Sequence, residues 1–309
     1  MSCVVISTSA SESDADRRER LWRGELVSLP PRPAVRALGD FAWELITKAF
    51  DGRDPHLAHE DMPVEDYVRL LGPLKTGFTH HPEAKRLIRE LLADLGCDTG
   101  ATYYDVPRMR VVTPASYLTA GLGYNYLPHR DTWYSAPQCQ VNWWAPISGV
   151  TGDSCMEFHP DFWQQRATNT SNAFDAYEWN KSARREAASY IKDDPRPHPH
   201  LSGGDAGSSV RLVGERGSII VFAGEQLHAT VPNRGRVTRF SFDFRTVHIH
   251  DVRHRAGPAK IDSASTGTTL RDFVSADGLE RLPEDLIAPY DVGGSVDGVL
   301  VFDPSVLSG

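Results

Sequence analysis

Two histidines, one aspartate and one arginine are the residues of this 309-residue chain whose types and spacing indicate chemistry. His129 and Asp131 lie in the run YNYLPHRDTWYSAPQCQVNWWAPI, and His228 and Arg239 lie in the run SIIVFAGEQLHATVPNRGRVTRFSFDF. Two imidazoles and one carboxylate form a facial triad that holds Fe(II) and leaves coordination positions open. An arginine on the strand after the second histidine would bind the carboxylate of an acid cosubstrate through a bidentate contact.

The spacing His-x-Asp is weak by itself, because two further triplets, at His59 and His159, share it. The triplet of His129 and Asp131 lies between two strand-like runs, and residues two apart in an extended chain point to the same side. The triplet at His59 falls among predicted helices and loops, so we interpret its side chains as polar residues at the protein surface. His159 and Asp161 follow a strand but lead into helical sequence, and they remain a rival pair of metal ligands.

His228 gains its significance from the sequence that follows it. It ends the apolar run IIVFAGEQL, where a lone histidine is more often structural than a ligand. The short connection VPNRGRV leads from it to Arg239 on a neighbouring strand, which places the arginine beside the metal pocket. Alternation puts Arg239, Ser241 and Asp243 on one face of that strand. A buried arginine needs an anionic partner, and this partner is either Asp243 or a bound dicarboxylate.

Polar and aromatic residues near His129 indicate a cavity around the metal. Gln140 and Asn142 share one side of the otherwise apolar run CQVNWWAPI, so we expect them to face a polar cavity that binds the cosubstrate; the alternative is an outward polar face. Aromatic side chains around the motif are candidates for stacking on the substrate, while core packing is the alternative for any one of them. The candidates are Tyr126, Trp133, Tyr134, Trp144 and Trp163.

The rest of the chain supplies the elements that would position these residues. Residues 1–20 are Ser- and Asp-rich without apolar periodicity and predict a mobile tail. Residues 21–309 predict a single catalytic domain. Apolar spacing predicts helices over 33–50, from about Pro63, and over 82–96. A later helix is predicted around the run LRDFVSADGLERL.

From residue 103 the pattern changes to short runs rich in β-branched and aromatic residues. They predict strands within 109–113, 123–127, 139–147, 154–158, 209–213, 217–224 and 237–247. Such strands predict a mainly β chain with flanking helices (α+β), whose core over about 103–250 is a double-stranded β-helix barrel of the jelly-roll or cupin-like type. The segment 159–209 interrupts the strands. We expect a lid or binding element there, or a solvated surface excursion.

Composition narrows the class of partner. The net charge of −8 argues against a general nucleic-acid or anionic-membrane binder. The four cysteines form no CxxC pair, so we expect reduced thiols in a cytoplasmic protein. Neither a signal peptide nor an apolar run long enough to span a membrane is evident. We therefore expect a small-molecule substrate.

Taken together, His129, Asp131, His228, Arg239 and Ser241 resemble the motifs of the Fe(II)/2-oxoglutarate-dependent oxygenases, most of all their phytanoyl-CoA-dioxygenase-like branch. The resemblance covers roughly residues 103–250. It implies Fe(II) on the triad, with 2-oxoglutarate and O2 as cosubstrates. It also implies that the cosubstrate's distal carboxylate lies on Arg239, with Ser241 or Thr230 adding a hydroxyl.

The same resemblance implies oxidation of an unactivated C–H bond in a small polar metabolite of natural-product biosynthesis. Related halogenases have a small residue in place of Asp131, so the carboxylate favours hydroxylation, desaturation or ring formation. The competing hypothesis is a non-catalytic, cupin-like metal- or ligand-binding barrel. In that case Arg239 would have no cosubstrate and would pair with Asp243.

Overall fold

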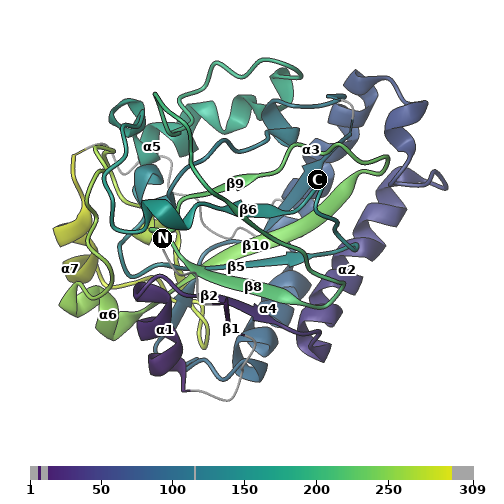
Figure 1. The fold of residues 1–309 in the computed structure, drawn as a ribbon. Coiled ribbons are helices and arrows are strands. Elements are labelled where there is room, and N and C mark those ends of the chain that lie inside the picture. The colour runs from purple at the N-terminus through teal and green to yellow at the C-terminus, as the bar shows by residue number, and fades with distance from the viewer. Residues whose placement is uncertain (1–5, 8–12, 115, 294–309) are drawn as a thin grey trace.

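A computed structural model describes residues 6–7, 13–114 and 116–293 of the chain (Figure 1). The helices are α1 Asp14–Trp22, α2 Pro33–Phe50, α3 Val64–His80, α4 Pro82–Asp94, α5 Ala176–Glu178, α6 Ile249–His254 and α7 Glu284–Ile287. The strands are β1 Ile6–Ser7, β2 Leu26–Leu29, β3 Thr102–Tyr104, β4 Arg108–Val112, β5 Val141–Pro146, β6 Met156–Phe158, β7 Val210–Leu212, β8 Ile219–Ala223, β9 His228–Thr230, β10 Arg239–His248 and β11 Val274–Ser275. Within the described ranges, no helix is long and apolar enough to cross a membrane.

The strands form two sheets. The larger has the order β1-β2-β8-β5-β10-β3-β11, with β4 also paired to β10, and the smaller has the order β7-β6-β9. Among the described strands, β1 and β2 pair in parallel and the other pairs are antiparallel. Ser241 of β10 lies opposite both Pro146 of β5 and Arg110 of β4, so β10 is central in the larger sheet. The predicted combination of antiparallel sheets and flanking helices is confirmed.

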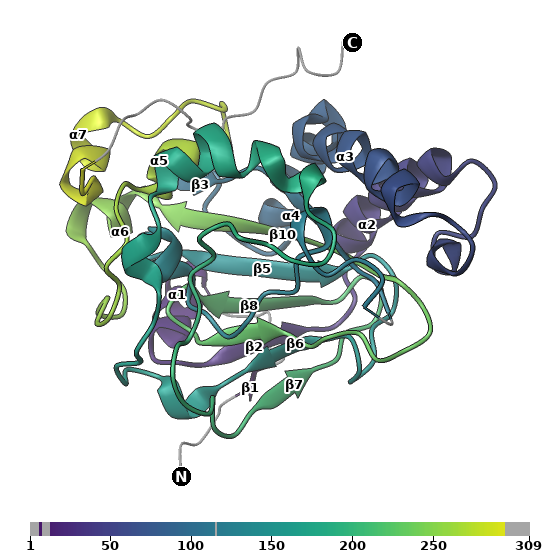
Figure 2. The same cartoon turned by 90° about the horizontal axis from the view of Figure 1, so that it is seen from above.

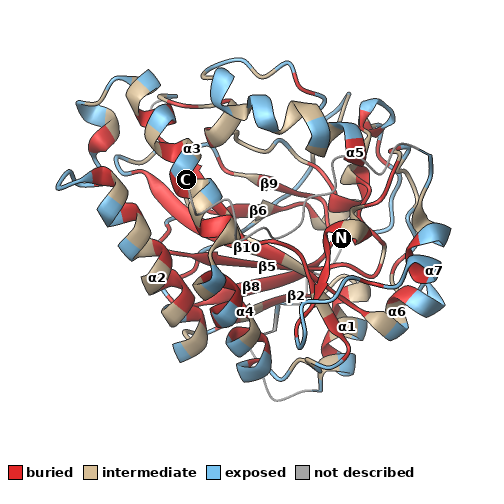
Figure 3. Ribbon diagram, turned by 180° about the vertical axis from the view of Figure 1, so that it is seen from behind, coloured by how far each residue is buried: buried red, intermediate tan, exposed pale blue. Residues whose placement is uncertain are grey.

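The two faces of the larger sheet pack against different partners because side chains alternate along each strand. Trp143 and Phe244 stack with ring centroids 5.9 Å apart and belong to the core shared with α2, α3 and α4. Trp144 points the other way and packs with Met156 and Phe158 of the smaller sheet. Viewed from behind, the strands are buried while α2 and α4 expose their outer sides (Figure 3). The space between the sheets therefore contains an apolar cluster that includes Trp144, Met156 and Phe158.

The helices predicted before the strands are confirmed. Helix α2 begins at Pro33, where a missing N–H costs nothing, and buries a stripe that includes Leu38, Ala42 and Ile46. Helix α4 likewise begins at a proline, and it buries Leu87, Ile88 and Leu91 among other residues. The helix expected near Pro63 is longer than foreseen, since α3 continues through an internal proline to His80. Figure 2 shows α2, α3 and α4 grouped on one side of the strands.

The prediction of a mobile tail over residues 1–20 is wrong for residues 14–20. These residues form most of helix α1, whose N-terminus is capped by the Ser13 hydroxyl accepting from the backbone N–H of Asp16. Arg17 is buried, donates to the carbonyl of Leu95, and lies over the Trp143 ring. The missed signal is a serine cap followed by acids in the first turn. Residues 1–5 and 8–12 lie outside the described residues.

Three other local predictions differ from the structure. Residues 123–127, predicted as a strand, instead follow a short 3-10 turn at Gly121–Gly123 without forming a strand. The helix expected around residues 270–282 is a 3-10 turn at Thr269–Asp272 followed by β11. His228 does not end the strand β8 but begins β9, because the turn 224–227 separates the two.

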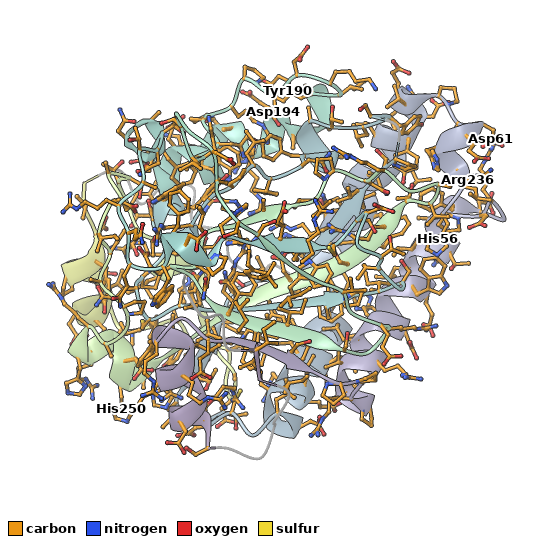
Figure 4. All side chains as sticks on the ribbon, in the orientation of Figure 1. His56, Asp61, Tyr190, Asp194, Arg236 and His250 are labelled. Carbon is orange, nitrogen blue, oxygen red and sulfur yellow. The ribbon has the colours of Figure 1, made fainter. Side chains whose placement is uncertain are left out.

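The segment 159–209 returns over the inner face of the sheets and closes against the loop at Gly121. Gly121 has φ of 57°, and a Cβ there would lie 2.0 Å from the carbonyl oxygen of Ala187, so only glycine permits this approach. Its N–H donates to Asp194 Oδ2 over 2.9 Å. Tyr190 and Asp194 are labelled on this segment at the upper rim of Figure 4. The segment is therefore packed against the domain and forms a wall of the cavity described below.

One fully buried arginine fixes the loop between His129 and Asp131. Arg130 donates from Nη1 to the carbonyl of Glu225 over 2.8 Å and to its Oε1 over 3.1 Å. From Nη2 it donates to the carbonyls of Phe162 and Gln165, each over 2.7 Å. The middle residue of the triplet thus joins the turn before His228 to the start of the inserted segment.

Replacing Arg130 by methionine should destabilise the protein strongly, because two buried and two partly buried hydrogen bonds would be lost. We expect the free energy of unfolding, measured by urea denaturation, to fall by about 3–5 kcal/mol. The exposed Arg216, which pairs with Asp40 on the surface, is the matched control. Arg216→Met should change the stability by less than about 1 kcal/mol, and an equal loss in both variants would contradict the anchoring role.

Candidate metal centre and adjoining cavities

The three predicted metal ligands lie together in one buried cluster. One ligand atom from each of His129, Asp131 and His228 lies within 4.8 Å of the others, and no other such group was found in the described part of the chain. Asp131 Oδ1 is 3.6 Å from Nε2 of His129 and 3.8 Å from Nε2 of His228. A single cation between these atoms would contact two imidazoles and one carboxylate on one side and leave the other side open.

Backbone pairing brings the two imidazoles together. His129 and His228 exchange two N–H to carbonyl hydrogen bonds of 2.9 Å each. Each ring also forms a hydrogen bond through Nδ1 to the carbonyl two residues earlier. His129 binds the carbonyl of Leu127 over 2.8 Å, and His228 binds that of Gln226 over 2.9 Å. A carbonyl can only accept, so Nδ1 donates and the lone pair is on Nε2. Both histidines therefore present Nε2 to the same point, as metal-binding histidines do.

Asp131 is oriented by contacts to its other oxygen. Oδ2 accepts from Gln140 Nε2 over 2.9 Å and from Arg245 Nε over 3.3 Å, which leaves Oδ1 toward the histidines. Burial opposes ionisation, but Arg245 and the two histidines hold the pKa of Asp131 well below its usual value. The carboxylate is consequently ionised across the physiological range and is ready to bind a cation.

His228 is kept neutral by its surroundings. Burial, reinforced by the neighbouring His129, lowers the pKa of His228 to about 3. A neutral imidazole is the form that binds a metal, so no proton has to leave His228 at neutral pH.

Arg239 lies in a narrow inner cavity of 80 Å³ that is also lined by all three triad residues. Its Nη1 donates to the carbonyl of Ser154 over 2.8 Å, and its guanidinium lies over the Trp144 ring at 5.5 Å. Its Nε is buried without a hydrogen-bond partner among the described residues. Burial lowers the pKa of Arg239 to about 10. Arg239 thus lines the same cavity as the triad, and its role toward a cosubstrate stays a prediction.

The alternative partner for Arg239, Asp243, is engaged elsewhere. Asp243 pairs with Arg110 of β4, and its Oδ1 is 3.1 Å from Nη1 of Arg245. Ser241, between the two on the same face of β10, has a buried hydroxyl without a partner in the described ranges. Arg239 and Ser241 therefore offer unused donors, which is what a bound carboxylate would require.

The other predicted cosubstrate residues also lie at this position. Thr230 and Asn142 line the inner cavity with Arg239. Gln140 lines the larger, adjoining cavity and donates both to Asp131 and to Asn142 Oδ1 over 2.8 Å. Gln140 thus acts on the triad through Asp131, and the expected polar side of β5 faces inward.

The larger cavity, of 490 Å³, opens onto His129 and Asp131 from the side of the inserted segment. Of the aromatic candidates, Tyr126 and Tyr134 line it, each with its ring centroid 5.3 Å from that of His129. Trp144 lines the inner cavity instead, beside Arg239. Phe174 and Trp179 of the inserted segment complete an aromatic wall that the sequence reasoning did not include.

Trp133 and Trp163 were predicted to stack on the substrate, but neither lines a described cavity. Trp133 is fully buried, packs with Leu227, and donates from Nε1 to Asp262 Oδ1 over 2.6 Å. Trp163 lies against Gly24, where a Cβ would be 2.8 Å from the indole. Both serve packing, and proximity in sequence to the triplet did not reflect proximity in space.

Arg245 and Arg110 are site residues that the sequence reasoning missed. Arg245 shares the inner face of β10 with Arg239 and contacts Asp131, so alternation continued two residues beyond Asp243 would have found it. Arg110 binds Asp243 and donates from Nη1 to the Tyr126 hydroxyl over 2.9 Å. Its role depends on the pairing of β4 with β10, which no local pattern specifies.

The rival triplets do not join the metal cluster. Asp61 and His56 are labelled at the periphery in Figure 4, far from the inner strands, and His59 lies in the same peripheral turn. His159 is buried, but its carboxylate neighbour Asp161 accepts from the Ser208 hydroxyl instead of joining a cluster of metal-binding side chains. The triplet at His129 is the one that joins the cluster, although it follows a loop and leads into the 3-10 turn Asp131–Tyr134 instead of lying between two strands.

No protein-family model and no curated protein matches this chain. Among solved structures, the non-heme monooxygenase ThoJ is 14% identical with a TM-score of 0.41, over 88% of this chain and 85% of ThoJ. EvdO2 from Micromonospora carbonacea var. aurantiaca, complexed with 2-oxoglutarate, is 14% identical with a TM-score of 0.44, over 78% and 93% of the two chains.

The non-heme alpha ketoglutarate dependent epimerase SnoN, from nogalamycin biosynthesis, is 12% identical with a TM-score of 0.38, over 76% of this chain and 82% of SnoN. These three structures are thus a non-heme monooxygenase, a protein complexed with 2-oxoglutarate and an alpha ketoglutarate dependent epimerase. At these TM-scores the likenesses decide nothing about activity, which the residues of the site must indicate.

Removal of one triad histidine should abolish metal binding while removal of the rival histidine should not. We expect His129→Ala to lose measurable Fe(II) binding in anaerobic calorimetry, because two ligands remain of three. His159→Ala should bind Fe(II) with the affinity of the parent protein. Retained binding in His129→Ala would contradict the assignment of the site.

Proposed function

We propose that this protein is an Fe(II)- and 2-oxoglutarate-dependent dioxygenase that oxidises an unactivated C–H bond of a small polar metabolite in natural-product biosynthesis. The observation that supports this most is the facial group of two histidines and one aspartate that shares a cavity with Arg239, whose buried Nε has no hydrogen-bond partner among the described residues. The Asp131 carboxylate would fill one coordination position of the metal. This fits hydroxylation or a related oxidation.

The residues present fit Fe(II) and the cosubstrate. Nε2 of His129, Oδ1 of Asp131 and Nε2 of His228 would hold the metal, and neutral imidazoles with a carboxylate suit Fe(II). When bound, iron and 2-oxoglutarate together supply the activation of O2, with oxidative decarboxylation of the cosubstrate to succinate and CO2. Gln140 and Arg245 keep Asp131 oriented and ionised for this task.

Arg239 would bind the distal carboxylate of 2-oxoglutarate in the inner cavity. Its free Nε and the unused Ser241 hydroxyl are donors without partners among the described residues, and Thr230 lines the same space. The Trp144 ring beneath the guanidinium and the small volume exclude bulk water. Exclusion of water strengthens the contact between the guanidinium and the carboxylate.

The larger cavity would take the substrate. It reaches His129 and Asp131 and is walled by Tyr126, Tyr134 and Trp179, so a substrate there would lie beside the metal. The inserted segment would act as its cover. Holding the target C–H bond at this position is the protein's contribution to selectivity.

The same proposal includes the architecture. The smaller sheet β7-β6-β9 and the inner face of the larger sheet would be the two halves of a double-stranded β-helix, with the metal between them. The packing of Trp144 against Met156 and Phe158, and the bridge between His129 and His228, support this assignment.

The competing hypothesis of a non-catalytic, cupin-like barrel predicted that Arg239 pairs with Asp243. Asp243 pairs with Arg110 and Arg245 instead, and the buried Nε of Arg239 has no partner within the described ranges. A structural arginine at this depth would be expected to have its partner within the fold. The free donors therefore favour a cosubstrate.

The protein with Fe(II), O2 and 2-oxoglutarate should release succinate even without its substrate. Arg239→Met should raise the KM for 2-oxoglutarate by roughly 10- to 100-fold, because hydrogen bonds to a charged group are lost. Succinate is measured by chromatography as a function of cosubstrate concentration. Arg236, an exposed arginine of the same connection that is labelled at the edge of Figure 4, is the matched control.

Arg236→Met should leave that KM unchanged. Iron binding by the parent protein without any consumption of 2-oxoglutarate would favour the non-catalytic barrel instead.

A further inference from the structure

The larger cavity above the metal centre has an excess of positive charge. Its lining contains three carboxylates, from Asp105, Asp131 and Asp272. Its cationic side chains are Lys75, Arg108, Arg110, Arg184, Arg185, Arg196 and Arg245. The chain as a whole has a net charge of −8, so this excess is local and is not the average of the molecule.

Most of the buried cations in this cavity are neutralised within the fold. Arg108 pairs with Asp105, and Arg110 pairs with Asp243. Arg245 contacts Asp131, and Arg196 donates from Nε to Asp194 Oδ1 over 2.7 Å. These pairs hold the walls and the triad in place and leave little charge for a ligand.

Lys75 and Arg184 are different, because both are partly buried and neither has a carboxylate within ion-pair distance among the described residues. Lys75, on α3, donates from Nζ to the carbonyl of Leu122 over 2.5 Å. The Arg184 guanidinium, on the inserted segment, makes no hydrogen bond within the described part of the chain. Asp272 attracts the Arg184 charge electrostatically.

Burial and neighbouring positive charges disfavour the charged forms of Lys75 and Arg184. Burial, then the positive charges of Arg110 and Arg184, lower the pKa of Lys75 to about 7. Burial, with Arg108 nearby, lowers the pKa of Arg184 to about 10. An anion between the two side chains would relieve both effects, because it would supply the missing opposite charge.

Lys75 and Arg184 approach the cavity from different elements. Figure 1 and Figure 2 both show the inserted segment running from α5 toward α3 along one rim of the strands. Arg184 directly follows a π-helical turn at Trp179–Ala183, and such turns are frequent at functional sites. The aromatic wall of Tyr134, Phe174 and Trp179 lies in the same cavity.

We infer that Lys75 and Arg184 bind an anionic group of the substrate, a carboxylate or a phosphate, and so hold the rest of the substrate against the aromatic wall and over the metal. This rests on the proposed function only in that the ligand is the substrate of the same site. The anionic group is distinct from the carboxylate of 2-oxoglutarate, because Arg239 lines only the inner cavity and Arg184 only the outer one, while Lys75 borders both. The substrate class is therefore a small, anionic, ring-containing metabolite.

Binding of three related probes tests this without turnover. Phenyl phosphate, benzoate and the neutral benzyl alcohol are titrated calorimetrically into protein loaded with Mn(II) and 2-oxoglutarate. We expect at least one anionic probe to bind saturably and benzyl alcohol to bind at least 10-fold more weakly. The stronger of the two anions identifies the group as phosphate or carboxylate.

Lys75→Met and Arg184→Met should each lower the affinity for the anionic probe by roughly 10- to 100-fold, since each removes a charged donor. Neither charge has a carboxylate partner among the described residues, so thermal unfolding should show that both variants fold, and Arg184→Lys should recover part of the affinity. Arg166→Met, at an exposed position of the same inserted segment, is the matched control and should bind as the parent does.

Failure of both anions to bind, equal binding of benzyl alcohol, or unchanged affinity in both methionine variants would overturn the inference. Succinate release in the absence of substrate would be unaffected by that outcome. Conversely, if succinate release were absent but the anions still bound, the proposed oxygenase activity would be contradicted and the proposed anion site would be supported.

Discussion

The site depends on two reciprocal backbone hydrogen bonds between His129 and His228. They join segments that are far apart in the chain and place both imidazoles at one point between the sheets. The bonds from each Nδ1 to a local carbonyl then turn Nε2 toward that point. Asp131 completes the group because the chain remains extended at Arg130 and then turns, so that one oxygen faces the histidines. The geometry of the metal site is therefore built mainly by main-chain groups, which are rigid.

Around this point the fold distributes positive charge in two layers. Arg245 forms an ion pair with Asp131, and Arg110 forms one with Asp243. Both pairs orient the side chains of the site. Arg239 lines the inner cavity, Arg184 the outer one and Lys75 both, and none of the three has a carboxylate within ion-pair distance among the described residues. Keeping such charge in a cavity is unfavourable for stability unless a ligand compensates for it. The arrangement thus favours two anionic ligands, a dicarboxylate near the metal and an anionic substrate farther out.

Sequence patterns predicted the metal group because its parts are set by short-range rules. Extended residues two apart placed His129 with Asp131, and a short connection placed Arg239 beside the triad. The same alternation would have given Arg245, which was overlooked. Lys75 and Arg184 could not be found in this way, because they line one cavity only as a result of how the inserted segment packs on α3. Helix α1 was missed although Ser13 signals its start, because the surrounding composition resembles a disordered tail.

The most direct test is a crystal structure obtained with Mn(II) and 2-oxoglutarate. The account predicts the metal bound to Nε2 of His129, Oδ1 of Asp131 and Nε2 of His228. It also predicts the distal carboxylate of the cosubstrate on Arg239 and the Ser241 hydroxyl. A metal held elsewhere, or a cosubstrate that leaves Arg239 without a carboxylate partner, would contradict it.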